Sequence, residues 1–365
     1  MTSSIVKFIY KNKIVEINNP DSNETILNYV RIKLKKTGTK EGCAEGGCGA
    51  CTVVLGELKK NNISYKAINS CIAFVPSLEG KQLILVEDLI SEDELHPVQK
   101  AMVNYHGSQC GFCTPGFVMS LFAMYKNYSS YKEDIIKDTI QGNLCRCTGY
   151  RPIIDAAKSL NKESRFDHFS RNKKITLDLL RKIKQRNIAI INDNKKYFAP
   201  TSVNKLKSIL KQEPNSKLIS GGTDVSLIVT KEKKDLNSLI YMNSINELNY
   251  IKENNSYIEV GATTPLINFD SFIKKYFPDF SQILKRYGSV QIRNICTIAG
   301  NIATASPIGD TLPLLLVLDS QIVIKDKSKT QILPLNGFFI GYRKTKLKKG
   351  QFIHSIRIPL LKKNI

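Results

Sequence analysis

Eight of the nine cysteines fall into two dense groups of four, and this clustering constrains the fold more than any other feature. The first group consists of Cys43, Cys48, Cys51 and Cys71; the second consists of Cys110, Cys113, Cys145 and Cys147. In the first group three cysteines share one loop and the fourth comes from elsewhere, which is the plant-type spacing of [2Fe–2S] ligands. Two such sites on one chain predict a protein that passes electrons.

The loop of the first group is rich in glycine, with Gly42, Gly46, Gly47 and Gly49 around its cysteines. Glycine lets one loop bend around a cluster and point amide N–H groups at the sulfurs. Zinc also takes four cysteines, but its usual spacing is two separate pairs, so the asymmetric loop favours iron–sulfur.

The spacing of the second group, two cysteine pairs, suits either zinc or an iron–sulfur cluster. Cys113 precedes Thr114 and Pro115, which suit the start of a helix, and a helix N-terminus favours a thiolate. Arg146 lies between the last two cysteines and supplies positive charge. These surroundings favour a cluster. Cys296 stands apart in an apolar run and is predicted to be a core residue.

Hydrophobic periodicity predicts four segments. Residues 1–88 form a small α+β domain that contains a hairpin over 5–17, a helix after Pro20 and strands at 52–55 and 83–86. Residues 89–165 form a helical domain, with helices beginning near 98, 115, 135 and 152. Residues 166–190 are charged and weakly patterned, and are predicted to be a linker.

Residues 191–365 are predicted to form an α/β or α+β domain, because strand-like runs alternate with helical ones. The strand-like runs are 217–220, 238–242, 257–261, 321–324 and 352–358. Two glycine-containing stretches follow strands in this domain, LISGGTDV at 218–225 and TIAGNIATASPIGD at 297–310. The first suits a loop whose backbone N–H groups approach a phosphate, and the second a loop packed on a flat ligand. Each is also compatible with an ordinary turn.

The formal net charge of +22 excludes little by itself. The lysines are spread along the whole chain, so a solvated surface is favoured, with an acidic partner protein as the second interpretation. Neither a nucleic-acid motif nor a membrane-spanning run of about eighteen apolar residues is found. Clustered cysteines without a secretory signal predict a reducing, cytoplasmic location.

Together these segments resemble the small subunits of xanthine dehydrogenases, which belong to the molybdenum hydroxylase family. The resemblance lies in GTKEGCAEGGCGACTV (38–53), LHPVQKAMVNYHGSQCGFCTPGFVMSLFA (95–123), GNLCRCTGYRPI (142–153) and the two glycine-containing stretches. It implies a β-grasp ferredoxin-like [2Fe–2S] domain, a four-helix [2Fe–2S] domain and an FAD-binding domain of the vanillyl-alcohol-oxidase type.

The resemblance also implies residue roles. One residue, Gln109, would lie beside the pterin of a molybdenum cofactor held by a separate large subunit. The implied FAD contacts are Leu218, Ile219, Ser220, Gly221, Gly222, Thr223, Asp224, Val225, Tyr287, Thr297, Asn301, Asp310 and Ile353.

The function implied by the resemblance is electron transfer from molybdenum on a partner, through both clusters and FAD, to NAD. The substrate would be hypoxanthine or xanthine, oxidised to urate within a hetero-oligomer, and no catalytic residue would lie on this chain. The alternatives are a related molybdenum hydroxylase acting on an aldehyde or another heterocycle, and a non-catalytic iron–sulfur protein. Because the sequence stops at Ile365, before a further subdomain of the family, a truncated FAD domain is expected.

Overall fold

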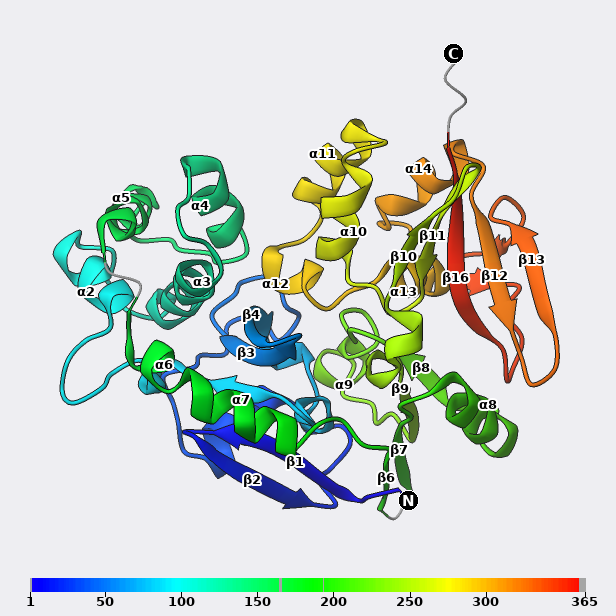
Figure 1. Cartoon of the computed structure of the whole chain (residues 1–365), viewed down its shortest axis with the longest axis horizontal. Helices are drawn as coiled ribbons and strands as arrows, with labels where there is room; N and C mark the ends of the chain where they lie inside the picture. Colours follow the sequence, from blue (N-terminus) through cyan, green and yellow to red (C-terminus); the bar gives the residue numbers. More distant parts are fainter. Residues whose placement is uncertain (1, 164–165, 193, 361–365) are drawn as a thin grey trace.

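A computed structural model describes residues 2–163, 166–192 and 194–360, which fold into three packed units (Figure 1). The first unit is a five-stranded mixed sheet in the order β2-β1-β5-β3-β4. Its strands are β1 (Ile5–Tyr10), β2 (Lys13–Asn18), β3 (Thr52–Lys59), β4 (Asn62–Asn69) and β5 (Gln82–Ile84). The predicted hairpin is confirmed: β1 and β2 pair antiparallel around Lys11 and Asn12, which both have positive φ. The predicted helix is also present, as α1 (Ile26–Asn28) and the π-helical turn η1 (Tyr29–Lys33).

The second unit contains the four predicted helices: α2 (Pro97–Asn104), α3 (Thr114–Asn127), α4 (Glu133–Ile140) and α5 (Arg151–Ser159). The helix α3 is central, and its side chains Phe117, Leu121 and Phe122 are fully buried. Prolines occupy early positions of α2, α3 and α5, where a missing N–H costs nothing. The predicted four-helix domain is therefore confirmed.

The segment predicted to be a linker, 166–190, contains two helices, α6 (His168–Arg171) and α7 (Lys173–Lys182). Helix α7 packs on strands β1, β3 and β4 through a narrow apolar stripe that includes Leu177 and Leu180. Lysines and arginines occupy its other faces, which is why the segment looks weakly patterned in the sequence.

The third unit has two sheets joined by helices (Figure 1). The smaller sheet, in the order β6-β7-β9-β8, consists of β6 (Ile188–Asn192), β7 (Lys195–Ala199), β8 (Lys217–Ile219) and β9 (Ser238–Tyr241). The larger, antiparallel sheet consists of β10 (Ile251–Glu253), β11 (Tyr257–Gly261), β16 (Phe352–Pro359), β12 (Gln321–Lys325) and β13 (Thr330–Pro334), in that order. The helices are α8 (Val203–Gln212), α9 (Leu227–Thr230), α10 (Leu266–Ile273), α11 (Pro278–Arg286), α12 (Val290–Arg293), α13 (Ile298–Thr304) and α14 (Thr311–Val317), and a short hairpin is formed by β14 (Phe339–Gly341) and β15 (Lys344–Thr345). Side chains of α10, α11, α13 and α14 share one hydrophobic core with the larger sheet.

The first sheet buries both of its faces, one against each of the other units. Ile9, Val54 and Ile84 share a core with the helical unit and α7. The opposite face, with Phe8 and Leu55 among its members, shares a core with strands of the smaller sheet in the third unit. The first sheet therefore lies between the other two units and packs against both of them. No helix in the described residues is long and apolar enough to cross a membrane.

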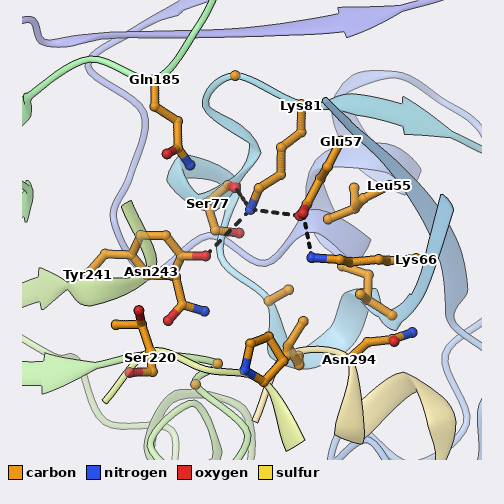
Figure 2. Close-up of a pocket in the computed structure, with 18 of the residues that line it drawn as sticks. Leu55, Glu57, Lys66, Ser77, Lys81, Gln185, Ser220, Tyr241, Asn243 and Asn294 are labelled. Atoms are coloured by element: carbon orange, nitrogen blue, oxygen red, sulfur yellow. Dashed lines mark hydrogen bonds and ion pairs between the residues drawn. The ribbon is translucent and has the colours of Figure 1, made fainter. Parts of the chain in front are cut away.

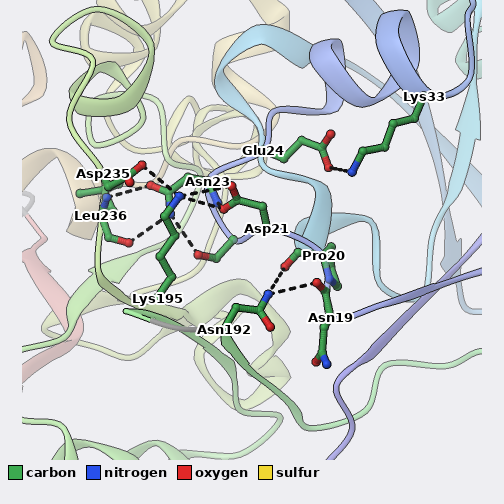
Figure 3. Close-up of polar contacts among 11 residues, drawn as sticks. Asn19, Pro20, Asp21, Asn23, Glu24, Lys33, Asn192, Lys195, Asp235 and Leu236 are labelled. Carbon is green, nitrogen blue, oxygen red and sulfur yellow. Dashed lines mark hydrogen bonds and ion pairs between the residues drawn. The ribbon is translucent and has the colours of Figure 1, made fainter.

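Hydrogen bonds reinforce the contact between the first and third units (Figure 3). The side chain of Asn23 accepts from the backbone N–H of Leu236 at 2.8 Å and donates to its carbonyl at 3.1 Å. At the more exposed edge, Asn192 donates to the carbonyls of Asn19 and Pro20. Because Asn23 is buried, its two bonds satisfy groups that water does not reach.

We expect Asn23→Ala to lower the free energy of unfolding by about 1–3 kcal/mol, because it leaves the buried N–H and C=O of Leu236 without partners. Urea denaturation followed by circular dichroism measures the loss. Asn192→Ala is the matched control and should cost less than about 1 kcal/mol, since water replaces its bonds. An equal loss in the two variants would contradict this assignment.

Candidate iron–sulfur and flavin sites

The strand pairing of the first sheet brings two cysteines of the first group together. Strands β3 and β4 are antiparallel, with Thr52 opposite Asn69, so the residues just outside this pair lie side by side. Cys51 precedes β3, and Cys71 follows β4 in a 3-10 turn. Their Sγ atoms are 3.3 Å apart, and both side chains are buried.

The remaining two cysteines of the first group reach this position through the glycine-rich loop. Cys43 lies against the thiols of both Cys48 and Cys71, and hydrogen bonds from these two groups lower the pKa of Cys43. The backbone N–H groups of Glu45 and Cys48 also donate to its sulfur, each at 3.4 Å. Gly46 and Gly49 have positive φ, which the predicted bending of the loop requires. Four thiols with amide donors around them suit a plant-type cluster.

The second group lies between the turns of the helical unit. Cys113 is the N-cap residue of α3, as predicted, and contacts Cys145. Cys110 contacts Cys147. The two outer cysteines of the group therefore pair with each other, and so do the two inner ones, Cys113 and Cys145. Burial raises the pKa of Cys145, but hydrogen bonds from Thr148 and further contacts outweigh it and bring the value down to about 7. Arg146, predicted to supply charge here, is exposed.

Tyr150 supports the second group, although its role was not predicted from the sequence. It adopts a left-handed conformation at φ 68°, which is unusual for a bulky residue. Two hydrogen bonds hold it there: its hydroxyl accepts from the N–H of Cys145 at 2.9 Å, and its own N–H donates to Thr148 Oγ1 at 3.2 Å. The backbone at Cys145, one of the predicted ligands, is thereby fixed.

No group of three or more His, Cys, Asp or Glu side chains in the described residues meets the geometry expected around a single metal ion. Both quartets are nevertheless gathered in space by the contacts above. Their donors are thiols, which is the ligand chemistry of a [2Fe–2S] cluster.

The two cysteine loops touch each other. The backbone N–H of Leu144, next to Cys145, donates to the carbonyl of Cys48 at 3.0 Å. Beside it, Asn143 donates to the carbonyl of Gly49 at 3.1 Å. Gln291, from the third unit, donates to Asn143 Oδ1 at 3.1 Å, so all three units meet at this point. Neither Asn143 nor Gln291 was predicted, because nothing local distinguishes them from other amides.

The phosphate-binding loop predicted at 218–225 leaves strand β8 and ends before α9. A Cβ on Gly221 would lie 2.2 Å from the carbonyl oxygen of Ile295, and Gly222 has φ of 71°. Glycine at these positions is therefore required by the chain's own packing. Asp224 forms an ion pair with Arg343 of the β14–β15 hairpin at 3.1 Å.

A cavity of about 720 Å³ opens beside this loop. Of the predicted FAD contacts, Leu218, Ser220 and Ile353 line it, together with Ala299 and Gly300 of the second predicted stretch. This volume lies in the range of cofactor pockets. The structure thus brings the two glycine-containing stretches together, as a shared ligand would require.

The other predicted FAD contacts surround this region in different roles. Asn301 donates to the hydroxyl of Tyr287 at 3.1 Å. Burial, followed by electrostatic interactions with Cys296, Asp310 and Asp224, raises the pKa of Tyr287. Thr297 is buried and caps α13 by accepting from the N–H of Gly300. Two further predicted contacts, Ile219 and Val225, belong to the core shared with the first unit, and Thr223 is half-buried.

The flavin-loop candidate also lies close to the first cysteine group. A Cβ on Gly222 would lie 3.5 Å from the carbonyl oxygen of Ile72, the neighbour of Cys71. The second cysteine loop, the first cysteine loop and the glycine loop are therefore consecutive in space. At the far end of this series Gln109, Cys110 and Cys147 are exposed at the surface.

Comparison with known proteins matches the three units to three sequence families. Residues 9–76 match a 2Fe-2S iron-sulfur cluster binding domain, 85–158 a [2Fe-2S] binding domain, and 191–361 the FAD binding domain in molybdopterin dehydrogenase. The chain belongs to the molybdenum hydroxylase family. The molybdenum hydroxylase fold predicted from the sequence, with two [2Fe–2S] domains and an FAD-binding domain, is confirmed.

The relatives of this molybdenum hydroxylase chain include xanthine dehydrogenases. That of Emericella nidulans is 32% identical over 97% of this chain and 30% of its own length, and that of Blastobotrys adeninivorans is 31% identical over 94% and 31%. The chain thus spans about a third of the length of the relatives that it matches. Among solved structures, carbon monoxide dehydrogenase from Hydrogenophaga pseudoflava matches 47% of this chain and 61% of its own, with 28% identity and a TM-score of 0.45.

We expect Cys71→Ser to lose the first cluster and retain the second, so that bound iron falls from about four atoms per chain to about two. Iron analysis and electron paramagnetic resonance of the reduced protein measure this change. Cys296→Ala is the control, because Cys296 is buried but belongs to neither group. Unchanged iron content in Cys71→Ser, or zinc in the wild-type protein, would contradict the ligand assignment.

We expect Gly221→Ala to weaken FAD binding by about tenfold or more, because the new methyl group overlaps Ile295 and must displace the loop. Flavin absorbance titrations measure the affinity. Gly341→Ala is the control, since its methyl group would meet no atom closer than 3.9 Å. Equal affinities would show that the loop conformation does not determine FAD binding.

Proposed function

We propose that this chain is the electron-transfer part of a xanthine dehydrogenase. It would receive electrons from a molybdenum cofactor on a partner subunit and deliver them to NAD during the oxidation of hypoxanthine or xanthine. When bound, the two clusters and FAD supply the redox chemistry, and the chain's own residues set their positions. The relatives named xanthine dehydrogenase, which match nearly the whole chain, support this choice of substrate.

The observation that carries the proposal is the close approach of consecutive sites. The bond from Leu144 to Cys48 joins a residue adjacent to one ligand with a ligand of the other group. On the other side, the carbonyl of Ile72, which follows Cys71, lies close to Gly222 of the glycine loop. A series of sites in which each lies close to the next suits the transfer of single electrons along the chain.

The exposed end of the series supplies a docking position for the partner subunit. Gln109 and Cys110 lie on the surface there, and the apolar side chains of Val103, Tyr105 and Phe112 in the same segment are also exposed. Exposed apolar side chains that are concentrated near a functional group are typical of a protein interface. We therefore assign Gln109 and its surroundings to contact with the molybdenum-bearing subunit.

The decisive experiment combines the chain with a large molybdenum-containing subunit and measures NADH formation with xanthine, hypoxanthine and several aldehydes. We expect turnover with the two purines. Turnover with aldehydes alone would assign the chain to a different molybdenum hydroxylase, and failure to form a complex would favour a free-standing carrier.

Cys71→Ser gives the assembled complex an internal control. Because it leaves the ligands of the second cluster intact, xanthine should still reduce that cluster, as seen by electron paramagnetic resonance. Formation of NADH should fall by at least about tenfold, since the first cluster lies between the second cluster and the flavin loop. Undiminished NADH formation would contradict the proposed order of sites.

A further inference from the structure

A second cavity, of about 480 Å³, lies between the first sheet and the opposite side of the glycine loop (Figure 2). Strands β3 and β4 form one wall, and Ser220, Gly221 and Gly222 form another. The cavity is thus separated from the candidate flavin cavity by only the loop that follows β8. Of the expected FAD contacts, Ile219, Ser220, Gly221 and Gly222 also line this cavity, whereas the rest of its lining has no expected cofactor role.

The lining of this cavity carries excess positive charge. Among its described residues are the lysines Lys59, Lys66, Lys81 and Lys184, against a single carboxylate, Glu57. Lys66 and Lys81 lie on either side of Glu57, with N–O distances of 2.5 and 3.8 Å. Burial raises the pKa of Glu57, but these two ammonium groups outweigh it and lower the value, so Glu57 remains ionised at neutral pH. One carboxylate cannot neutralise both lysines.

The two lysines beside Glu57, Lys66 and Lys81, differ in the number of hydrogen bonds that they donate. Lys81 is 9% exposed and donates to the carbonyl of Ser77 at 2.8 Å and to Tyr241 at 3.5 Å, besides its contact with Glu57. For Lys66, Glu57 is the one hydrogen-bond acceptor found within the described residues. An ammonium group has three donors, so Lys66 has donors available for a ligand at the open side of the cavity.

Buried polar groups in the same lining also lack partners. Within the described residues, Tyr197 Oη and Ser226 Oγ have none, and both side chains are fully buried. A buried hydroxyl without a partner costs about 1–3 kcal/mol, so a native cavity of this kind is normally occupied by polar atoms. Figure 2 shows the Tyr241 hydroxyl directed toward Lys81, with Asn243 and Ser220 beside each other on the same side of the cavity.

We propose that this cavity binds a small oxyanion, a phosphate or carboxylate group, between the first [2Fe–2S] domain and the FAD-binding domain. The ammonium group of Lys66, together with the hydroxyl and amide donors of the lining, supplies the charge-assisted hydrogen bonds that such a group prefers. A bound anion would contact both domains at once, and would fix the side of the glycine loop that faces away from the flavin cavity.

The test is isothermal titration calorimetry of the full chain with inorganic phosphate and, separately, with citrate, at constant ionic strength in Tris–chloride. We expect saturable one-to-one binding of at least one probe, and which probe binds identifies the phosphate or the carboxylate class. Lys66→Gln should weaken binding about tenfold or more, and Glu57→Gln should strengthen it several-fold by removing the competing carboxylate.

Lys13→Gln is the matched control, because Lys13 is an exposed lysine of the same sheet that does not line the cavity. If Lys66→Gln does not fold, Asn243→Ala provides the same test by removing an amide from the wall. Absence of saturable binding in the wild-type chain would overturn the proposal and leave a water-filled cavity. An equal weakening in Lys13→Gln would also overturn it, by assigning the binding to general surface charge. Neither outcome depends on xanthine turnover.

Discussion

The contact between Asn143 and Gln291 determines how the three units fit together. Both side chains are almost completely buried, and they meet Ser120, Thr52 and the carbonyl of Gly49 in one hydrogen-bonded group. Buried amides stabilise a structure only when their partners are correctly placed, so the group permits one arrangement of the domains and disfavours others. The distance between the two cysteine loops therefore depends on the packing of all three units.

The two cysteine groups and the four helices of the second unit could be predicted from the sequence because their signals are local. Spacing, glycine content and helix-start residues around Cys43 or Cys113 depend on few neighbours. Strand β4 was not predicted, although Ile63, Tyr65 and Ala67 alternate with the polar Ser64 and Lys66 as in a half-buried strand. Asn143 and Gln291 could not be predicted because their partners come from distant parts of the chain. Gly221 was expected to let the backbone approach a ligand, but in the structure a Cβ at this position would overlap the carbonyl oxygen of Ile295.

The ion pairs formed by the many lysines and arginines differ in how much they contribute to stability. Most lysine–carboxylate pairs are exposed, as in Lys137–Glu133, and such pairs contribute little. Two of the pairs that connect units have one deeply buried partner each: Arg293 in the third unit bonds Asp138 in the helical unit, and Arg186 bonds Glu79 of the first unit. These few pairs fix orientation, whereas the remaining charge keeps the surface hydrated.

The core shared by the first sheet and the smaller sheet of the third unit has a consequence for synthesis. Phe8 and Leu55 leave the ribosome early, but Tyr197 and Leu239, which complete their packing, are made much later. Domains normally fold in the order in which they emerge. Here one apolar face of the first sheet remains exposed to solvent until the polypeptide has been synthesised past β9. During that interval the nascent chain presents an incomplete ferredoxin-like domain to chaperones and to the machinery that inserts clusters.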